Sequence, residues 1–271
     1  MRHLLLTVSL ALGLAATTAP AQEVASELVS LESGVDARGW ESVGRLDIRN
    51  KGFCTATLIE DDLILTAAHC VYDGSGGLID ADRLTFHAGL RAGRAEATRG
   101  VTRLIAHPAY RHEGGVTEPN RVAMDIAVLR LDRPIRRPRI QPFPIAARPD
   151  FGDEVFVVSY GRSRSEAASL QDLCSVKGRQ EGIIVMTCAV EPGSSGSPVF
   201  ITQDGERRIA SVVSAMANLD GEPVSLGTSL QEPLQELLAH FARSGTVAPA
   251  GEVRIMSIGE RNGTGAKFIR R

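Results

Sequence analysis

The feature that most constrains the fold is a succession of short β-branched or alternating apolar runs with glycine, proline, aspartate or asparagine nearby. Such runs are typical of strands joined by hairpins, so the pattern predicts an all-β protein. The expected strands are 53–59, 63–66, 84–88, 101–106, 126–131, 155–159, 183–188, 199–202 and 209–215. One segment differs, because residues 232–243 place leucines and a phenylalanine on one helical face before Gly245. We expect this helix to act as a packing clamp.

A proline- and arginine-rich segment divides the chain near its middle. Residues 134–149 contain five prolines and four arginines, which predicts an extended connector between two halves. The 271 residues, 43% of them hydrophobic, suit one globular unit or two small ones. The net charge of -2 gives no general attraction to nucleic acid or anionic membrane. The connector lacks a series of aromatic stacking residues and a matching basic face, so we expect a solvated segment and no nucleic-acid partner.

The first 21 residues have the pattern of a secretory signal peptide. Arg2 precedes an apolar stretch from Leu4 to Ala16 that is too short to span a bilayer, and Ala19-Pro20-Ala21 resembles a cleavage site. A membrane anchor is the alternative, which this length and these flanks disfavour. We therefore expect a secreted or periplasmic protein that begins near Gln22 and has no membrane anchor.

Export makes the four cysteines candidates for disulfide bonds. Cys54 and Cys70 are close in sequence, as are Cys174 and Cys188, and pairing of near neighbours is the simplest connectivity. Each bond would close a loop of about 15 residues and contribute roughly 3 kcal/mol. A zinc site is the alternative, but no C-x-x-C pair is present, so we expect no metal.

Three motifs carry side chains that can act together in nucleophilic catalysis. His69 follows an apolar strand in Thr66-Ala67-Ala68-His69-Cys70, where an imidazole could take a proton from serine and return it to a leaving group. Asp125 lies among apolar neighbours and needs a partner there, for which the other imidazole nitrogen is suited. Ser195 lies in Gly193-Ser194-Ser195-Gly196-Ser197-Pro198. The chain order is therefore His, Asp, Ser.

The glycines around Ser195 permit a tight turn. In such a turn the backbone N–H groups of Gly193 and Ser195 can converge on the oxygen of a reacting carbonyl as an oxyanion hole. Taken singly, each motif has a simpler interpretation: an ordinary Ser/Gly/Pro loop, or a histidine buried in a core. Their joint occurrence favours the catalytic interpretation.

With these segments together, residues 40–243 resemble the chymotrypsin-like, trypsin-fold serine peptidases. Thr-Ala-Ala-His-Cys is the most specific string, and Ala106-His107-Pro108-Ala109-Tyr110 and Val157-Val158-Ser159-Tyr160-Gly161 add to the likeness. The resemblance implies two six-stranded antiparallel β-barrels with a C-terminal helix. It also implies His69 as general base, Asp125 as its orienting group and Ser195 as nucleophile. Polypeptides would be the substrates, without a cofactor, and we expect a monomer.

This resemblance also sets the expected domain boundaries. Residues 22–39 would be an N-terminal extension or propeptide. Barrel 1 would span about 40–133, the crossover 134–149, barrel 2 about 150–230 and the helix 231–243, with a tail over 244–271.

The Gly-Ser-Ser-Gly-Ser-Pro string and the Cys174–Cys188 pair look closest to the secreted bacterial glutamyl-endopeptidase-like branch. Animal members carry an acid immediately before the nucleophile, which pairs with a newly cut N-terminal ammonium. This chain has Ser194 there and no basic-Ile-Val-Gly-Gly string. We therefore expect that it does not use that activation switch.

Specificity is predicted from the same likeness. The position that floors the primary pocket is an acid in Lys/Arg-cutting enzymes and is Ala189 here. Val190 and the stretch around Ser214 lack the threonine and histidine of the glutamyl-specific pattern. If Met216 replaces a glycine that usually leaves the pocket open, it narrows the pocket. We expect a small or medium apolar residue before the cut.

Two other classes of function compete with a peptidase. An α/β-hydrolase esterase would need G-x-S-x-G, but Ser197 occupies the last glycine position and the only later histidine is His240. A catalytically inactive binding protein on the same fold remains the stronger alternative. The isolated His87, His107 and His112 lack ligand spacing, and the aspartates of residues 73–82 lack a calcium-loop pattern.

Overall fold

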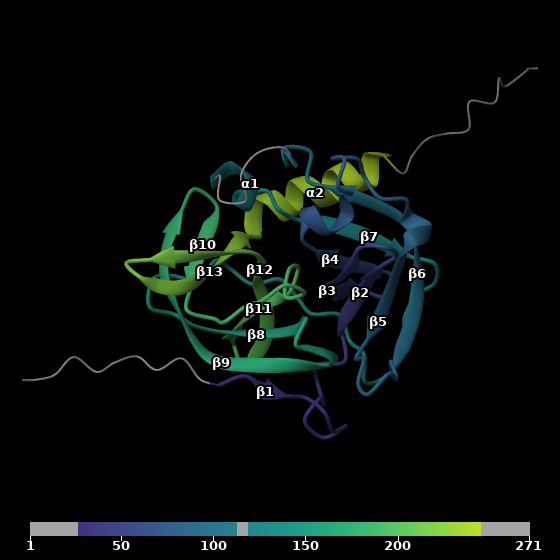
Figure 1. The fold of residues 1–271 in the computed structure, drawn as a ribbon, viewed down its shortest axis with the longest axis horizontal. Helices are drawn as coiled ribbons and strands as arrows, with labels where there is room; N and C mark the ends of the chain where they lie inside the picture. The colour runs from purple at the N-terminus through teal and green to yellow at the C-terminus, as the bar shows by residue number, and fades with distance from the viewer. Residues whose placement is uncertain (1–26, 113–118, 245–271) are drawn as a thin grey trace, which may run out of the picture.

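Strands from the two halves of the chain form separate closed sheets. The computed structural model describes residues 27–112 and 119–244. In the first half, six antiparallel strands close into a barrel in the order β2-β3-β4-β7-β6-β5 (Figure 1). They are β2 (Val43–Ile48), β3 (Gly52–Glu60), β4 (Leu63–Thr66), β5 (Leu84–Ala88), β6 (Ala97–Ala106) and β7 (Ala127–Leu131).

The second half forms another ring of antiparallel pairings, in the order β9-β10-β13-β12-β11-β8. Its strands are β8 (Glu154–Gly161), β9 (Arg164–Gln180), β10 (Ile183–Met186), β11 (Pro198–Gln203), β12 (Glu206–Leu219) and β13 (Glu222–Ser229). The ring closes because the long β9 pairs with β8 along its first part and with β10 along its last. A short β1 (Val29–Ser30) pairs with β9. These two barrels and the C-terminal helix confirm the predicted fold class.

The remaining elements are short, except for the last helix. They are the 3-10 turns η1 (Ala68–Val71) and η2 (Ala81–Arg83), α1 (Pro119–Ala123) and α2 (Gln231–Ser244). In α2 the side chains of Leu234, Leu237 and Phe241 are buried, and the helix lies against β6 and β7. The guanidinium of Arg103 donates to the Phe241 carbonyl oxygen and lies 3.9 Å from the ring centroid. None of the helices within the described residues is long and apolar enough to cross a membrane.

An aromatic cluster lies where the connector meets the second barrel. Trp40 is 5.3 Å from Phe200 and 6.2 Å from Phe143, measured between ring centroids. Phe143 comes from the proline-rich connector, which also buries Ile135 and Ile140. The four arginines of the connector are exposed, so this segment is solvated on its basic face and anchored by its apolar residues.

Several strands extend beyond their predicted bounds or were not predicted. β1, β2, β9 and β13 were missed, and β12 is longer than expected. β9 has no sustained alternation because charged and small residues interrupt its apolar positions and two bulges interrupt its pairing with β8. Neighbouring strands determine which residues on each face of such a strand are buried, and local periodicity does not reveal these neighbours.

Candidate functional site

Strand register brings His69 and Asp125 together at one end of the first barrel. β4 ends at Thr66 and β7 begins at Ala127, and these two residues are direct partners in the antiparallel ladder. His69 lies just after β4, in η1, and Asp125 lies just before β7. Two residues 56 positions apart therefore face each other because antiparallel neighbours place one strand's end beside the other's start.

The contact between these side chains is close and oriented. His69 Nδ1 is 2.7 Å from Asp125 Oδ2, and the His69 backbone N–H donates to Asp125 Oδ1 at 2.9 Å. The Ser214 hydroxyl donates to Oδ2 as well. Since an ionised carboxylate only accepts hydrogen bonds, a neutral imidazole in this position carries its proton on Nδ1 and its lone pair on Nε2. The Asp125 side chain is 3% exposed and that of His69 25%.

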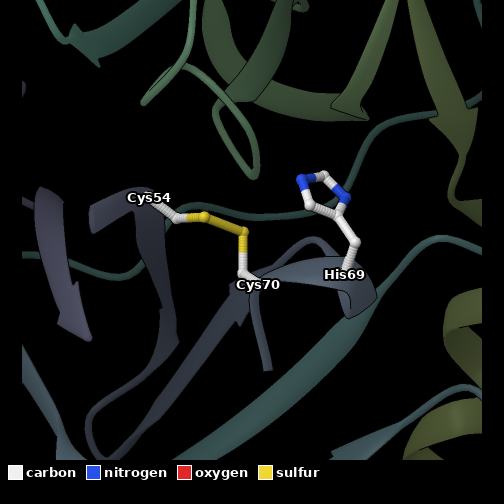
Figure 2. A group of neighbouring side chains, drawn as sticks. All are labelled: Cys54, His69 and Cys70. Atoms are coloured by element: carbon white, nitrogen blue, oxygen red, sulfur yellow. A yellow bond between two sulfur atoms is a disulfide. The ribbon is translucent and has the colours of Figure 1, made fainter. Parts of the chain in front are cut away.

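The turn that carries His69 is fixed on two sides. The Lys51 ammonium donates to the carbonyl oxygens of His69, at 3.0 Å, and Tyr72, at 2.6 Å. Burial lowers the pKa of Lys51, while the charge of Asp73 opposes that shift. A disulfide joins Cys54 of β3 to Cys70, and Figure 2 shows the His69 ring beside it. Sequence reasoning missed Lys51, for which no local signal exists.

The cysteine sulfurs near His69 do not form a metal site in this state. One ligand atom each of Cys54, His69 and Cys70 lie within 4.8 Å of one another. Both sulfurs are used in the disulfide, so neither offers the thiolate that zinc requires. The second disulfide joins Cys174 of β9 to Cys188.

The loop that carries Ser195 belongs to the second barrel but is docked on the first. Thr55 of β3, which is fully buried, donates its backbone N–H to the Ser195 carbonyl oxygen at 2.9 Å. Its hydroxyl donates to the Gly193 carbonyl oxygen at 3.0 Å and accepts from the Tyr160 N–H. Thr55 is a second positioning residue that sequence reasoning missed, although it lies in the strand predicted over 53–59.

Glycine is required on both sides of Ser195. Gly193 has φ +104° and a Cβ there would lie 2.5 Å from the Phe53 ring, while Gly196 has φ +80° and a Cβ would lie 2.2 Å from Thr66 Oγ1. Within residues 27–112 and 119–244, the N–H groups of Gly193 and Ser195 donate no hydrogen bond. The half-buried Ser195 hydroxyl also makes none among these residues. Both backbone donors and the hydroxyl are therefore available to a ligand.

A cavity of about 750 Å³ lies in the second barrel next to the second disulfide. Three of the four predicted pocket residues, Ala189, Val190 and Met216, line it. Ser214 does not, since its hydroxyl is directed to Asp125. The cavity wall also contains residues that were not predicted, namely Gln171, Lys177, Thr187, Cys188, Leu219, Asp220, Glu222, Pro223 and Val224. Gln171 Oε1 accepts from the Ala189 N–H at 2.7 Å and so fixes that wall.

The isolated histidines lie in separate environments. His87 Nε2 is 3.3 Å from Asp47 Oδ2. His107 is buried and accepts from the Ala109 N–H, and burial lowers its pKa, while Glu236 opposes this. His112 stacks on Tyr72 at 4.9 Å between centroids. Asp73 accepts from Ser75 and Gly77 in its own loop, and these hydrogen bonds lower its pKa.

Comparison with known proteins places this arrangement in a family. The sequence model of the trypsin family, described as "Trypsin", matches residues 33–225, more than half of the chain. Among solved structures, one titled "Structure of Glu endopeptidase in complex with MPD" superposes with a TM-score of 0.60. It is 19% identical, and the match covers 76% of this chain and 91% of that one. The chain belongs to the trypsin family of serine endopeptidases.

Proposed function

We propose that this chain is a secreted endopeptidase that cleaves peptide bonds through His69, Asp125 and Ser195. The observation that carries the proposal is the oriented His69–Asp125 pair, whose carboxylate accepts from the imidazole, from the His69 N–H and from Ser214. A buried carboxylate in this position fixes the imidazole tautomer that a general base needs.

In the proposed mechanism, Ser195 Oγ attacks the carbonyl carbon of the substrate while His69 Nε2 removes the hydroxyl proton. The tetrahedral intermediate then expels the amine, to which His69 returns the proton, and an acyl-enzyme remains on Ser195. Water, activated by the same imidazole, hydrolyses the ester. Asp125 stabilises the imidazolium formed in both steps and is not itself protonated.

The backbone N–H groups of Gly193 and Ser195 form the oxyanion hole in this proposal. Two features support the assignment. Neither N–H group donates a hydrogen bond elsewhere among the described residues, and Thr55 donates hydrogen bonds to the carbonyl oxygens of both Gly193 and Ser195. Donors that are fixed before the reaction stabilise the developing negative charge without reorganisation.

The cavity beside Ala189 and Val190 is the proposed pocket for the residue before the cut. Met216, whose exposed fraction is 56%, supplies an apolar wall. Lys177 on one strand and Asp220 and Glu222 on the β12–β13 hairpin give the lining both signs of charge. The three predicted pocket positions that line the cavity, Ala189, Val190 and Met216, are all apolar, which supports a small or medium apolar residue before the cut, as the sequence pattern also predicts.

Export is part of the proposal. Its support is the signal-peptide pattern of residues 1–21, which lies outside the described residues, and the two disulfides, which persist in oxidising compartments. The proposed location is the periplasm or the extracellular medium of a bacterium.

Labelling with a fluorophosphonate tests the proposed mechanism. The reagent is attacked by an activated serine, so the purified protein should carry one adduct, mapped by peptide mass spectrometry to Ser195. S195A and H69A should abolish labelling. H87A is the matched control, because His87 also contacts a carboxylate but, within the described residues, has no hydrogen bond or ion pair with residues 191–197; it should label normally. Absence of an adduct on the folded protein would instead support a binding protein that has lost catalysis.

A further inference from the structure

A buried hydroxyl sits immediately before the proposed nucleophile. Ser194 is fully buried, and its hydroxyl donates to the Tyr160 carbonyl oxygen at 3.2 Å. It accepts from the Glu191 N–H at 3.3 Å and from Arg164 Nη2 at 3.0 Å. The guanidinium cation of Arg164 therefore lies against the buried side of the loop that carries Ser195.

Arg164 supplies that cation from the start of β9. Its side chain is only 15% exposed, and its guanidinium donates to the carbonyl oxygen and, at 2.9 Å, to the hydroxyl of Ser159. Its Nε lies 3.2 Å from Glu191 Oε1. Burial lowers the pKa of Arg164 and the Glu191 charge opposes this, but an arginine stays protonated in proteins.

Glu191 is held in turn by its surroundings. Both carboxylate oxygens accept from the Ser163 hydroxyl, at 2.7 and 2.9 Å. The carboxylate lies so close to Gly161 that a Cβ there would be 1.9 Å from Oε1. The space that the Glu191 carboxylate occupies in this ion pair therefore depends on Gly161, at the end of β8.

Two of the groups that Arg164 contacts, Glu191 and Ser194, lie on either side of Gly193 in the chain. Glu191 lies two residues before Gly193 and Ser194 lies one residue after it, and the Ser194 N–H donates to the Glu191 carbonyl oxygen at 2.8 Å. The Arg162 N–H donates to the Pro192 carbonyl oxygen at 2.8 Å. The β8–β9 hairpin therefore holds residues 191–194 through the Arg164 guanidinium, the Ser163 hydroxyl and the Arg162 backbone N–H.

We propose that Arg164 is a positioning residue that, with Glu191, holds Gly193 and Ser195 in reactive geometry from within the folded chain. No newly cut N-terminus is then needed to supply the cation, because the guanidinium belongs to β9. This inference rests on the proposed function, since it concerns the loop that carries its nucleophile. Arg164 contacts neither the substrate pocket residues nor His69 and acts only through the loop.

Kinetics of R164A with chemical rescue test this role. Loss of the guanidinium should lower kcat for a peptide substrate by about 10²-fold, as misplacement of a reactive group does, with a much smaller change in KM. Guanidinium ion at a non-denaturing concentration should bind in the space that the Arg164 side chain leaves and restore kcat in a saturable manner. Sodium chloride of equal ionic strength should not restore kcat. A structural role alone would not give such rescue.

R91A is the matched control, because Arg91 forms a similarly buried pair with Glu96 in the first barrel. It should keep kcat near that of the unchanged chain and should not respond to guanidinium. If R164A does not fold, R164Q replaces it in the kcat comparison. A folded R164A or R164Q variant with unchanged kcat would overturn the inference, as would rescue of R91A.

These outcomes are distinguishable from failure of the proposed function. If the unchanged chain is labelled at Ser195 by fluorophosphonate and R164A is labelled at the same rate, the function stands and this inference fails. If the unchanged chain is not labelled at all, the proposed function fails first.

Discussion

Replacing Asp125 with asparagine should disable the proposed general base, while the new side chain keeps nearly the same shape as the old one. In the structure Oδ1 accepts from the His69 backbone N–H, and Oδ2 accepts from Ser214 and from His69 Nδ1. An asparagine has one oxygen and one NH₂ group to fill these two positions. If the NH₂ group takes the Oδ1 position, it faces the His69 N–H, and two donors meet.

The opposite orientation avoids that clash but changes the histidine. With the oxygen at the Oδ1 position, the NH₂ group donates toward His69 Nδ1, which must then be the unprotonated nitrogen. The proton moves to Nε2, where the base is needed. In Ser-His-Asp enzymes this wrong tautomer lowers kcat by about 10⁴-fold. At roughly 1.4 kcal/mol per tenfold, the expected loss is about 5 kcal/mol of transition-state stabilisation.

The assay is kcat for a peptide substrate, together with the rate of fluorophosphonate labelling. Nitrogen-15 NMR of the labelled imidazole should show that the proton has moved from Nδ1 to Nε2. D47N is the matched control, since Asp47 also contacts a histidine, His87, and its replacement should leave kcat unchanged. A kcat for D125N within about tenfold of the unchanged chain would mean a loss below about 1.4 kcal/mol, and Asp125 would then not set the tautomer of a catalytic histidine.

Two further predictions concern pH and specificity. Burial lowers the pKa of His107, which faces Glu236 and His240, so the folded state favours the neutral ring. The contribution of His107 to the free energy of unfolding is therefore fully present above the ordinary histidine pKa of about 6.5 and declines as the pH falls below it. In H107N, which keeps an acceptor for the Ala109 N–H, the urea midpoint should vary less with pH below this value, and an unchanged slope would contradict the assignment. M216G should open the cavity and shift a peptide-library profile toward larger apolar residues before the cut. A profile identical to that of the unchanged chain would place Met216 outside the pocket.

Much of the candidate site could be predicted because its signals are local. A histidine next to a cysteine after an apolar strand, an aspartate within an apolar run and a serine between glycines are each visible in a few residues. β4 and β5 were predicted with their observed bounds. β5 alternates between buried and half-buried positions, and β4 is a short apolar run buried at every position; both patterns are typical of strands that pack against a core.

What the sequence left open depends on partners far along the chain. Ser214 was predicted as a pocket residue, yet it donates to Asp125 across 89 positions. Thr55 and Arg164 are important because they contact the Ser195 loop. Strand pairing brings Thr55 to this loop, and the β8–β9 hairpin brings Arg164 to it.

The chemical groups, the all-β class and the neighbouring cysteine pairs could be predicted from the chain alone, since each follows from residue type and short-range spacing. Which of these groups meet depends on the folded backbone. The Thr66–Ala127 register aligns the histidine with the carboxylate, and docking of one barrel on the other places the serine loop against Thr55. The physical reason is that a hydrogen bond depends on distance and direction in space, and for residues far apart in the chain only the folded backbone sets these.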